Sequence, residues 1–153
     1  MSISLTVNGA LHTSPAAPET PLLYILRNDL GLDSARYGCG AAQCGACNVL
    51  LDDRVIRSCV VTAAAASPGK ITTLEGLGST GKLSALQRAF IEEQAVQCGY
   101  CIPGIIISSH NLLTRVSNPN EAEIEAALDR NLCRCGTHTR ILRAIARAAK
   151  ESA

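Results

Sequence analysis

Eight cysteines in two groups of four constrain this chain of 153 residues more than any other feature of its sequence. An even number allows four disulfide bonds, which is the simplest structural interpretation. Cysteine makes up only about 5% of the residues, whereas disulfide scaffolds contain roughly 8–10%. A chain of this length also buries enough surface to fold without such cross-links. We therefore expect the cysteines to serve metal binding or catalysis.

The rest of the composition excludes several classes of protein. Basic and acidic residues nearly balance, 14 against 13, so nothing indicates a nucleic-acid footprint. No run of 18 apolar residues could span a membrane, and the N-terminus lacks the basic start and apolar stretch of a secretory signal. We expect assembly in the cytoplasm, where thiols stay reduced. A periplasmic or membrane-associated location would then require exported partner subunits.

The first cysteine group has the C-x4-C-x2-C…C spacing of plant-type [2Fe–2S] proteins. Its members are Cys39, Cys44, Cys47 and, after eleven intervening residues, Cys59. Three glycines punctuate the loop, at positions 38, 40 and 45. Glycine permits positive φ and lets backbone N–H groups approach the sulfurs, where they stabilise the added charge of a reduced cluster. The spacing predicts a [2Fe–2S] cluster on these four thiolates.

The second group is Cys98-x2-Cys101, followed after 31 residues by Cys133-x-Cys135. Each pair precedes a predicted helix, so two helix N-termini would direct partial positive charge toward an anionic site. A structural zinc ion also takes four thiolates, although the C-x-C pair is shorter than the usual zinc spacing. On spacing alone, the second group stays open between a [2Fe–2S] cluster and zinc.

The N-terminal half is predicted to consist mostly of strands. Asn8-Gly9 is a strong signal for a two-residue hairpin turn, and Asp52-Asp53 indicates a second hairpin. The predicted strands are Ile3–Val7, Leu11–Thr13, Asn48–Leu51, Arg54–Cys59 and Ile71–Leu74. One helix is expected to start at Thr20-Pro21, with Thr as the N-cap and Pro at the first helical position, and to stop near Gly31.

The C-terminal half is predicted to consist of four helices joined by short links. The helix signals are the capping box Ser84-x-x-Gln87, the segment Pro103–Leu113, a start at Asn118–Glu121 and an apolar stripe from Ile141 to Ala149. One Phe, three Tyr and no Trp leave small and aliphatic side chains to pack closely. The sequence thus predicts an α+β protein with domains at 1–75 and 83–153 and a Gly-rich linker at 76–82.

Both cysteine groups, in this order, resemble those of the small iron–sulfur subunit of the xanthine oxidase family of molybdenum hydroxylases. The resemblance covers nearly the whole chain. Its matching segments are 37–40, 44–47, 57–59, 72–77, 97–104 and 131–135, including Gln97-Cys98-Gly99-Tyr100-Cys101 and Asn131-Leu132-Cys133-Arg134-Cys135.

The resemblance implies a ferredoxin-like β-grasp domain followed by a four-helix bundle, with a [2Fe–2S] cluster in each. Electrons would pass from substrate to molybdenum, to the cluster of the second cysteine group, to that of the first, and then to an acceptor. The implied partners are a large subunit that binds molybdopterin in its cytosine dinucleotide form and an acceptor subunit, either a cytochrome c or an FAD protein. Gln97, otherwise an ordinary helix-end residue, would contact that molybdopterin.

The sequence departs from the family pattern in two places. Many members read Cys-Arg-Cys-Thr-Gly-Tyr, whereas this chain has Cys133-Arg134-Cys135-Gly136-Thr137-His138. The order Gly-Thr resembles a branch with nicotinate, isoquinoline and membrane-linked aldehyde oxidoreductases, so the implied reaction is hydroxylation of an aldehyde or an aromatic N-heterocycle. Asp53 stands where glycine is usual, which leaves the local turn geometry open.

The sequence shows no acid–base pair or nucleophile that would mark a catalytic site. We therefore expect the chain to relay electrons for a catalytic partner as one subunit of an oxidoreductase. Two other functions stay open at this point. One is a free-standing ferredoxin with two clusters, and the other is an interaction module that binds zinc.

Overall fold

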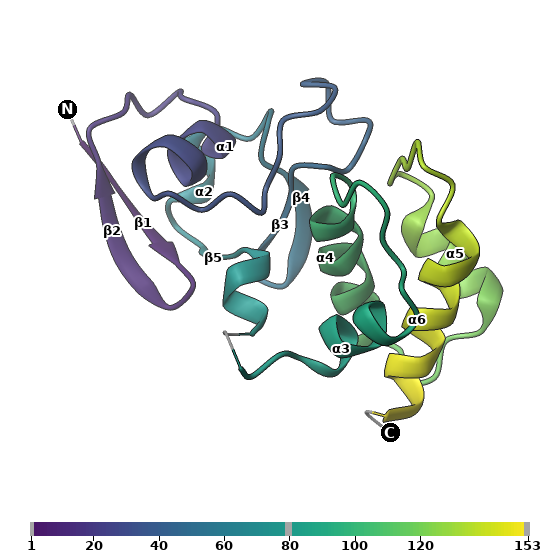
Figure 1. The fold of residues 1–153 in the computed structure, drawn as a ribbon. Coiled ribbons are helices and arrows are strands. Elements are labelled where there is room, and N and C mark those ends of the chain that lie inside the picture. Colours follow the sequence, from purple (N-terminus) through teal and green to yellow (C-terminus); the bar gives the residue numbers. More distant parts are fainter. Residues whose placement is uncertain (1, 79–80, 152–153) are drawn as a thin grey trace.

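The computed structural model describes residues 2–78 and 81–151. A sheet with short helices forms the N-terminal half, and four longer helices stand beside the β3–β4 side of that sheet (Figure 1). The structure thereby confirms the α+β class. No helix in the described ranges is long and apolar enough to cross a membrane.

The sheet has five strands in the order β2-β1-β5-β3-β4. Neighbouring strands are antiparallel except β1 and β5, which are parallel. The strands are β1 (Ile3–Val7), β2 (Ala10–Ser14), β3 (Asn48–Leu51), β4 (Arg54–Arg57) and β5 (Lys70–Thr72). The last two predicted strands were extended too far, because Cys59 and Leu74 lie in a turn and in a 3-10 helix, η2 (Leu74–Leu77).

Both predicted hairpin turns are present. Asn8 and Gly9 have positive φ values of 51° and 81°, and Asp52 and Asp53 have 47° and 62°. Positive φ at both central residues is the backbone pattern of a type I′ turn, which matches the twist of the flanking strands. Asp53 therefore adopts the conformation that favours glycine. A side-chain oxygen of Asp52 accepts a hydrogen bond from the Lys70 N–H at 2.8 Å, which ties this hairpin to β5.

The helix expected after Thr20 differs from its prediction. Pro21, not Thr20, occupies the N-cap position, and the helix is divided into α1 (Leu22–Tyr24) and a π-helical segment, η1 (Ile25–Asp29). Leu22 and Leu26 are fully buried in the core beneath the sheet. A further short helix, α2 (Ala63–Ala66), was not predicted. Its start is capped by the Thr62 hydroxyl, which accepts a hydrogen bond from the Ala65 N–H.

The four longer helices of the C-terminal half are confirmed, as are the predicted capping box at Ser84 and the predicted helix start at Asn118–Glu121, where the structure adds a second capping box. Ser84 and Gln87 form a capping box on α3, and Asn120 and Glu123 form one on α5. The helices are α3 (Ala85–Glu92), α4 (Ile102–Leu113), α5 (Glu121–Leu128) and α6 (His138–Glu151). Small residues let them pack closely, since the side chains of Ala89, Ala144 and Ala148 are completely buried.

Candidate metal centres

Three cysteines of the first group lie between η1 and β3, and the fourth follows the β3–β4 hairpin. Cys39 and Cys44 lie in the loop itself, Cys47 immediately precedes β3, and Cys59 follows β4. The β3–β4 hairpin therefore returns the fourth cysteine to the loop that carries the other three. Of the three glycines in this loop, Gly40 and Gly45 adopt positive φ, at 66° and 79°.

Backbone donors converge on the sulfur of Cys39. The N–H groups of Ala41, Gln43 and Cys44 donate to Cys39 Sγ at 3.3, 3.2 and 3.4 Å. These hydrogen bonds, from Ala41 first and Gln43 second, lower the pKa of Cys39 to about 6. Donors arranged in this way stabilise a thiolate, which is the form of cysteine that binds metals.

The second cysteine group lies in two loops of the helical half. Cys98 and Cys101 connect α3 to α4, which begins at Ile102, and Cys133 and Cys135 connect α5 to α6, which begins at His138. The structure thus places both pairs just before helix N-termini, as the sequence predicts. The Tyr100 N–H lies 3.5 Å from Cys98 Sγ, and hydrogen bonds from Tyr100 and then Cys135 lower the pKa of Cys98.

Thr137 lies against the second cysteine group, and sequence reasoning missed it. Its hydroxyl lies 3.5 Å from Cys133 Sγ. Burial alone would raise the pKa of Cys133, but hydrogen bonds from the Thr137 hydroxyl and backbone N–H outweigh it and lower the pKa to about 6. The signal was visible as the departure Gly136-Thr137, which moves the threonine by one position relative to the common family pattern.

The thiols of both groups approach one another in pairs. In the first group, Cys39 pairs with Cys44 and Cys47 pairs with Cys59. In the second group the pairs are Cys98 with Cys135 and Cys101 with Cys133. Two of these pairs contain a thiol with a raised pKa. Burial raises the pKa of Cys47 to about 11 and that of Cys101 to about 12.

This arrangement fits a binuclear cluster. All eight cysteines are free thiols. A [2Fe–2S] cluster takes four thiolates distributed over two irons. Two close pairs in each group correspond to that donor set.

The two loops contact each other directly. The Leu132 N–H, next to Cys133, donates to the carbonyl oxygen of Cys44 at 2.9 Å. Beside this contact, Asn48 at the start of β3 is buried, and its Nδ2 donates to the Ser108 hydroxyl at 2.9 Å and to Asn131 Oδ1 at 3.0 Å. The two cysteine groups are therefore joined through one hydrogen bond and a shared buried network.

An exposed aromatic surface lies beside the second group. Tyr37 and Tyr100 are 50% and 49% exposed, and the Tyr100 hydroxyl donates to the Tyr37 carbonyl. The Arg36 guanidinium carbon lies 5.3 Å from the centre of the Tyr100 ring, and Arg36 also donates to the Gly99 carbonyl at 2.6 Å. Gln97 is exposed in the same loop. This surface spans both halves of the chain.

Comparison with known proteins identifies both halves. Residues 5–73 match the 2Fe-2S iron-sulfur cluster binding domain, and residues 73–146 match the [2Fe-2S] binding domain. The chain therefore carries two domains that bind [2Fe–2S] clusters.

Relatives that match over nearly the whole chain are named as parts of oxidoreductases. One of the nicotinate dehydrogenase subunits of Pseudomonas putida is 53% identical over 97% of this chain and 95% of its own length. The alpha chain of isoquinoline 1-oxidoreductase from Brevundimonas diminuta is 43% identical over 99% of both chains. In the crystal structure of quinoline 2-oxidoreductase from Pseudomonas putida 86, one chain matches with a TM-score of 0.93 and 34% identity, over 99% of this chain and 95% of that one. The chain thus belongs to the iron–sulfur small subunits of the xanthine oxidase family of molybdenum hydroxylases.

Proposed function

We propose that this chain relays electrons from the molybdenum centre of a large subunit to an external acceptor, through two [2Fe–2S] clusters. The observation that carries the proposal is the gathering of all eight thiols into two groups of four that are joined by the hydrogen bond from the Leu132 N–H to the Cys44 carbonyl. Each cluster, when bound, accepts and returns one electron.

The ligand sets follow the two cysteine groups. Four thiolates around the β-grasp loop would hold the first cluster, and four in the helical half would hold the second. The thiol pairs support the assignment of Cys39 and Cys44 to one iron and Cys47 and Cys59 to the other. In the helical half, the corresponding pairs are Cys98 with Cys135 and Cys101 with Cys133.

Backbone and hydroxyl donors of this chain set the electronic environment of each site. Three N–H groups point at Cys39 Sγ, whereas one N–H group approaches Cys98 Sγ and the Thr137 hydroxyl approaches Cys133 Sγ. Hydrogen bonds to sulfur stabilise the more negative, reduced state. Because the two sites differ in the type and number of donors, we expect their reduction potentials to differ.

The hydrogen bond from Leu132 to Cys44 supports the relay between the sites. It joins the residue before Cys133 to Cys44 itself, so only one non-covalent step separates the two ligand loops. We propose that electrons enter at the helical half and leave at the β-grasp half.

The boundaries that we propose for these units are 1–75 and 83–153, joined by a linker at 76–82. The 3-10 helix η2 overlaps the start of that linker, and residues 79–80 lie outside the described ranges.

The partner of the helical half would be a large subunit with molybdopterin in its cytosine dinucleotide form. The exposed rings of Tyr37 and Tyr100, with Arg36 stacked on Tyr100, support contact with a partner, and exposed Gln97 would reach the pterin. The acceptor would be a cytochrome c or an FAD protein.

The substrate of the complex would be an aromatic N-heterocycle, because relatives at 53% and 43% identity are named for nicotinate and isoquinoline. An aldehyde is the second candidate, since an aldehyde oxidoreductase subunit of Escherichia coli is 39% identical.

Metal and sulfide analysis of fresh, anaerobically purified protein tests the cluster assignment. We expect four irons and four acid-labile sulfides per chain. Two irons with one zinc would refute the second cluster and support the zinc interpretation. Low-temperature EPR of the reduced protein should show two signals, and Cys47→Ser should change only one of them. If both signals disappear while the fold survives, the division of ligands is wrong.

Purification from native extracts tests the role in a complex. The proposal predicts that the chain co-purifies with a large subunit containing molybdenum, and that the substrate of this complex reduces the clusters of the chain. A stable, monomeric chain that is fully active as an electron carrier, with no partner in extracts, would replace this proposal with the free-standing ferredoxin.

A further inference from the structure

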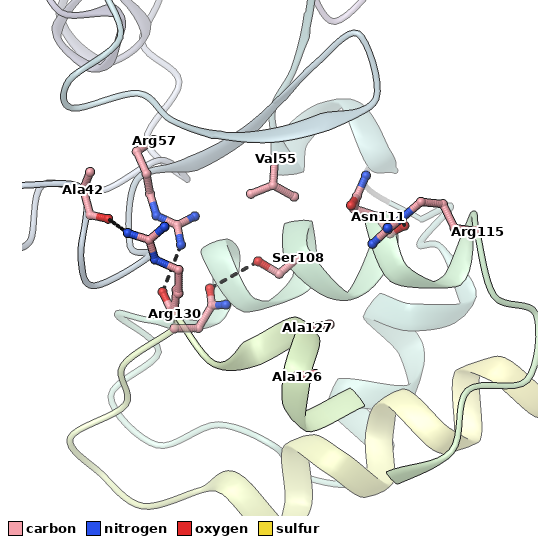
Figure 2. A pocket seen from close by; sticks show the side chains of 10 residues that line it. Ala42, Val55, Arg57, Ser108, Asn111, Arg115, Ala126, Ala127 and Arg130 are labelled. Atoms are coloured by element: carbon pink, nitrogen blue, oxygen red, sulfur yellow. Dashed lines mark hydrogen bonds between the residues drawn. The ribbon is translucent and has the colours of Figure 1, made fainter. Parts of the chain in front are cut away.

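A cavity of about 330 Å³ lies between β4, α4 and the end of α5, next to the first cysteine loop (Figure 2). Three arginines from three different parts of the chain line it. Arg57 ends β4, Arg115 follows the end of α4 by two residues, and Arg130 follows the end of α5 by two residues. All the other lining residues are uncharged.

No carboxylate of the described part of the chain forms an ion pair with these three arginines, and the negative groups that act on Arg57 are the neighbouring thiolates, Cys47 first. The ion pairs found in the described ranges involve Arg27, Arg88 and Arg147, and none of the three cavity arginines takes part in them. Arginine presents a fork of N–H donors that matches the oxygens of carboxylates and phosphates. The charge and donor geometry of the cavity therefore favour an anion.

Arg57 and Arg130 form the most concentrated part of this positive surface. Their guanidinium groups lie together at the end of the cavity near Ala42, whereas Arg115 lies at the opposite end (Figure 2). Arg57 donates to Asn48 Oδ1 and, at 3.1 Å, to the Arg130 carbonyl, so it is held in place from two sides. Its Nε is buried and has no hydrogen-bond partner in the described structure.

The like charges of Arg57 and Arg130 repel each other, yet backbone contacts keep them adjacent. The Arg130 guanidinium donates to the Ala42 carbonyl at 3.4 Å. The backbone carbonyl of Arg130 accepts a hydrogen bond from the Arg57 guanidinium. Two guanidinium groups held side by side without a carboxylate leave donors that a bound oxyanion would satisfy. Ser108 and Asn131, which are both buried, also line this cavity and are polar.

We propose that this cavity binds an oxyanion, a carboxylate or a phosphate, between the guanidinium groups of Arg57 and Arg130. The anion comes either from free solution or from an acidic side chain of a partner subunit, and both sources offer the same chemistry to the arginines. Arg115 strengthens the positive field from the far end of the cavity.

The position of the site links it to electron transfer. Ala42, whose carbonyl accepts from Arg130, lies between Cys39 and Cys44 in the sequence. Negative charge held there disfavours reduction of the neighbouring site, so occupancy would lower the potential of the cluster that we propose for this loop. This consequence rests on the proposed function, whereas the anion site itself does not.

Isothermal titration calorimetry tests the site. The full, cluster-loaded chain is titrated with inorganic phosphate and, as a carboxylate probe, with sodium acetate, at a constant ionic strength set with chloride. We expect saturable binding of at least one of the two anions. Arg130→Gln should weaken it roughly tenfold or more, and Arg130→Lys should weaken it less, because it keeps the charge but loses the fork. Arg54→Gln, which removes the same charge from an exposed position on β4, should leave binding unchanged.

Absence of saturable binding of both anions would overturn the proposal, and so would equal binding by the wild-type chain and Arg130→Gln. The same titration of the assembled complex identifies the source of the anion. If binding disappears in the complex, an acidic partner side chain occupies the cavity; if binding persists, the site takes a free anion. The binding measurement does not require electron transfer, so it fails or succeeds independently of the proposed relay.

Discussion

Gly104 on helix α4 lies so close to Gly45 in the first cysteine loop that a Cβ atom at position 104 would overlap the carbonyl oxygen of Gly45. The two halves of the chain therefore meet backbone to backbone at this point, within one residue of Cys44. Gly45 is constrained as well, since it has positive φ and a Cβ there would come within 2.5 Å of Asn131 Oδ1.

Gly104→Ala should destabilise the protein by about 1–3 kcal/mol, because α4 and the cysteine loop must separate to admit the methyl group. Chemical denaturation of the cluster-loaded chain measures the effect. The sign is diagnostic, since the same substitution in an unobstructed helix interior stabilises by roughly 0.5–1 kcal/mol. A more stable Gly104→Ala variant would show that the close contact is absent in solution.

Leu132→Pro should slow electron exchange between the two clusters, because proline removes the N–H that donates to the Cys44 carbonyl. Leu132→Ala keeps this N–H and serves as the matched control for loss of the side chain. Stopped-flow reduction, with the two clusters followed by rapid-freeze EPR, measures the exchange rate. Equal rates in the two variants, with both clusters fully loaded, would rule out a role for this hydrogen bond.

Thr137→Val should lower the reduction potential of the cluster in the helical half and leave the other unchanged. The variant removes the hydroxyl that lies 3.5 Å from Cys133 Sγ. A hydrogen bond with a net value of about 0.5–1.5 kcal/mol corresponds to roughly 20–65 mV for a one-electron couple. EPR-monitored potentiometry gives both potentials, and Thr139→Val, at an exposed threonine on α6, is the control. An unshifted potential in Thr137→Val would contradict the proposed role.

Glu75→Gln should destabilise the protein at neutral pH and have little effect in acid. Burial alone would raise the pKa of Glu75, but hydrogen bonds from Ser34 and Thr73 outweigh it and lower the pKa below 4.5. Because the folded pKa is depressed, the contribution is complete above pH ~4.5 and is lost as the pH falls through the folded value. The side chain is only partly buried and remains in contact with solvent, so solvent screening limits the effect to about 0.5–1 kcal/mol. Thermal unfolding at several pH values, with Glu19→Gln as an exposed control, checks this; a difference that does not depend on pH would contradict it.

Gln97→Ala should leave both clusters intact and slow their reduction by substrate in the assembled complex. The expected cause is loss of a contact between the loop that carries Cys98 and the pterin of the large subunit. Rapid-mixing absorbance measurements of cluster reduction test this, with Gln94→Ala as a nearby exposed control. Unchanged kinetics in Gln97→Ala would reject the role proposed for Gln97.

Features with a local sequence signal could be predicted. The hairpin at Asn8-Gly9 and the capping boxes at Ser84 and Asn120 need only neighbouring residues, and all three are present. The spacing of the first cysteine group likewise predicts three cysteines on one loop and a fourth after a hairpin. The structure confirms this, since three of them precede β3 and Cys59 follows β4. The helix Ala63–Ala66 was also readable, because Thr62 before four alanines is a helix start with strong helix formers behind it.

Features that depend on distant residues could not be predicted. The hydrogen bond between Leu132 and Cys44 joins positions 88 residues apart, and the cavity of Arg57 and Arg130 forms only when β4 and the end of α5 meet. No periodicity or spacing marks such contacts. The π-helical segment Ile25–Asp29 also escaped prediction, because its apolar pattern is the same as that of an ordinary helix.

The buried side chain of Asn48 has a consequence for how this molecule unfolds and how it could be recombined. Its amide donates to Gly104, Ser108 and Asn131, all of which belong to the helical half, while its backbone belongs to the sheet. Separating the halves would break these three hydrogen bonds together, and a residue without this amide at position 48 would leave the three acceptors buried without their donor. The two domains should therefore melt as a single cooperative unit, and a chimera that transplants the helical half onto a foreign ferredoxin would have to carry an asparagine at this position with it.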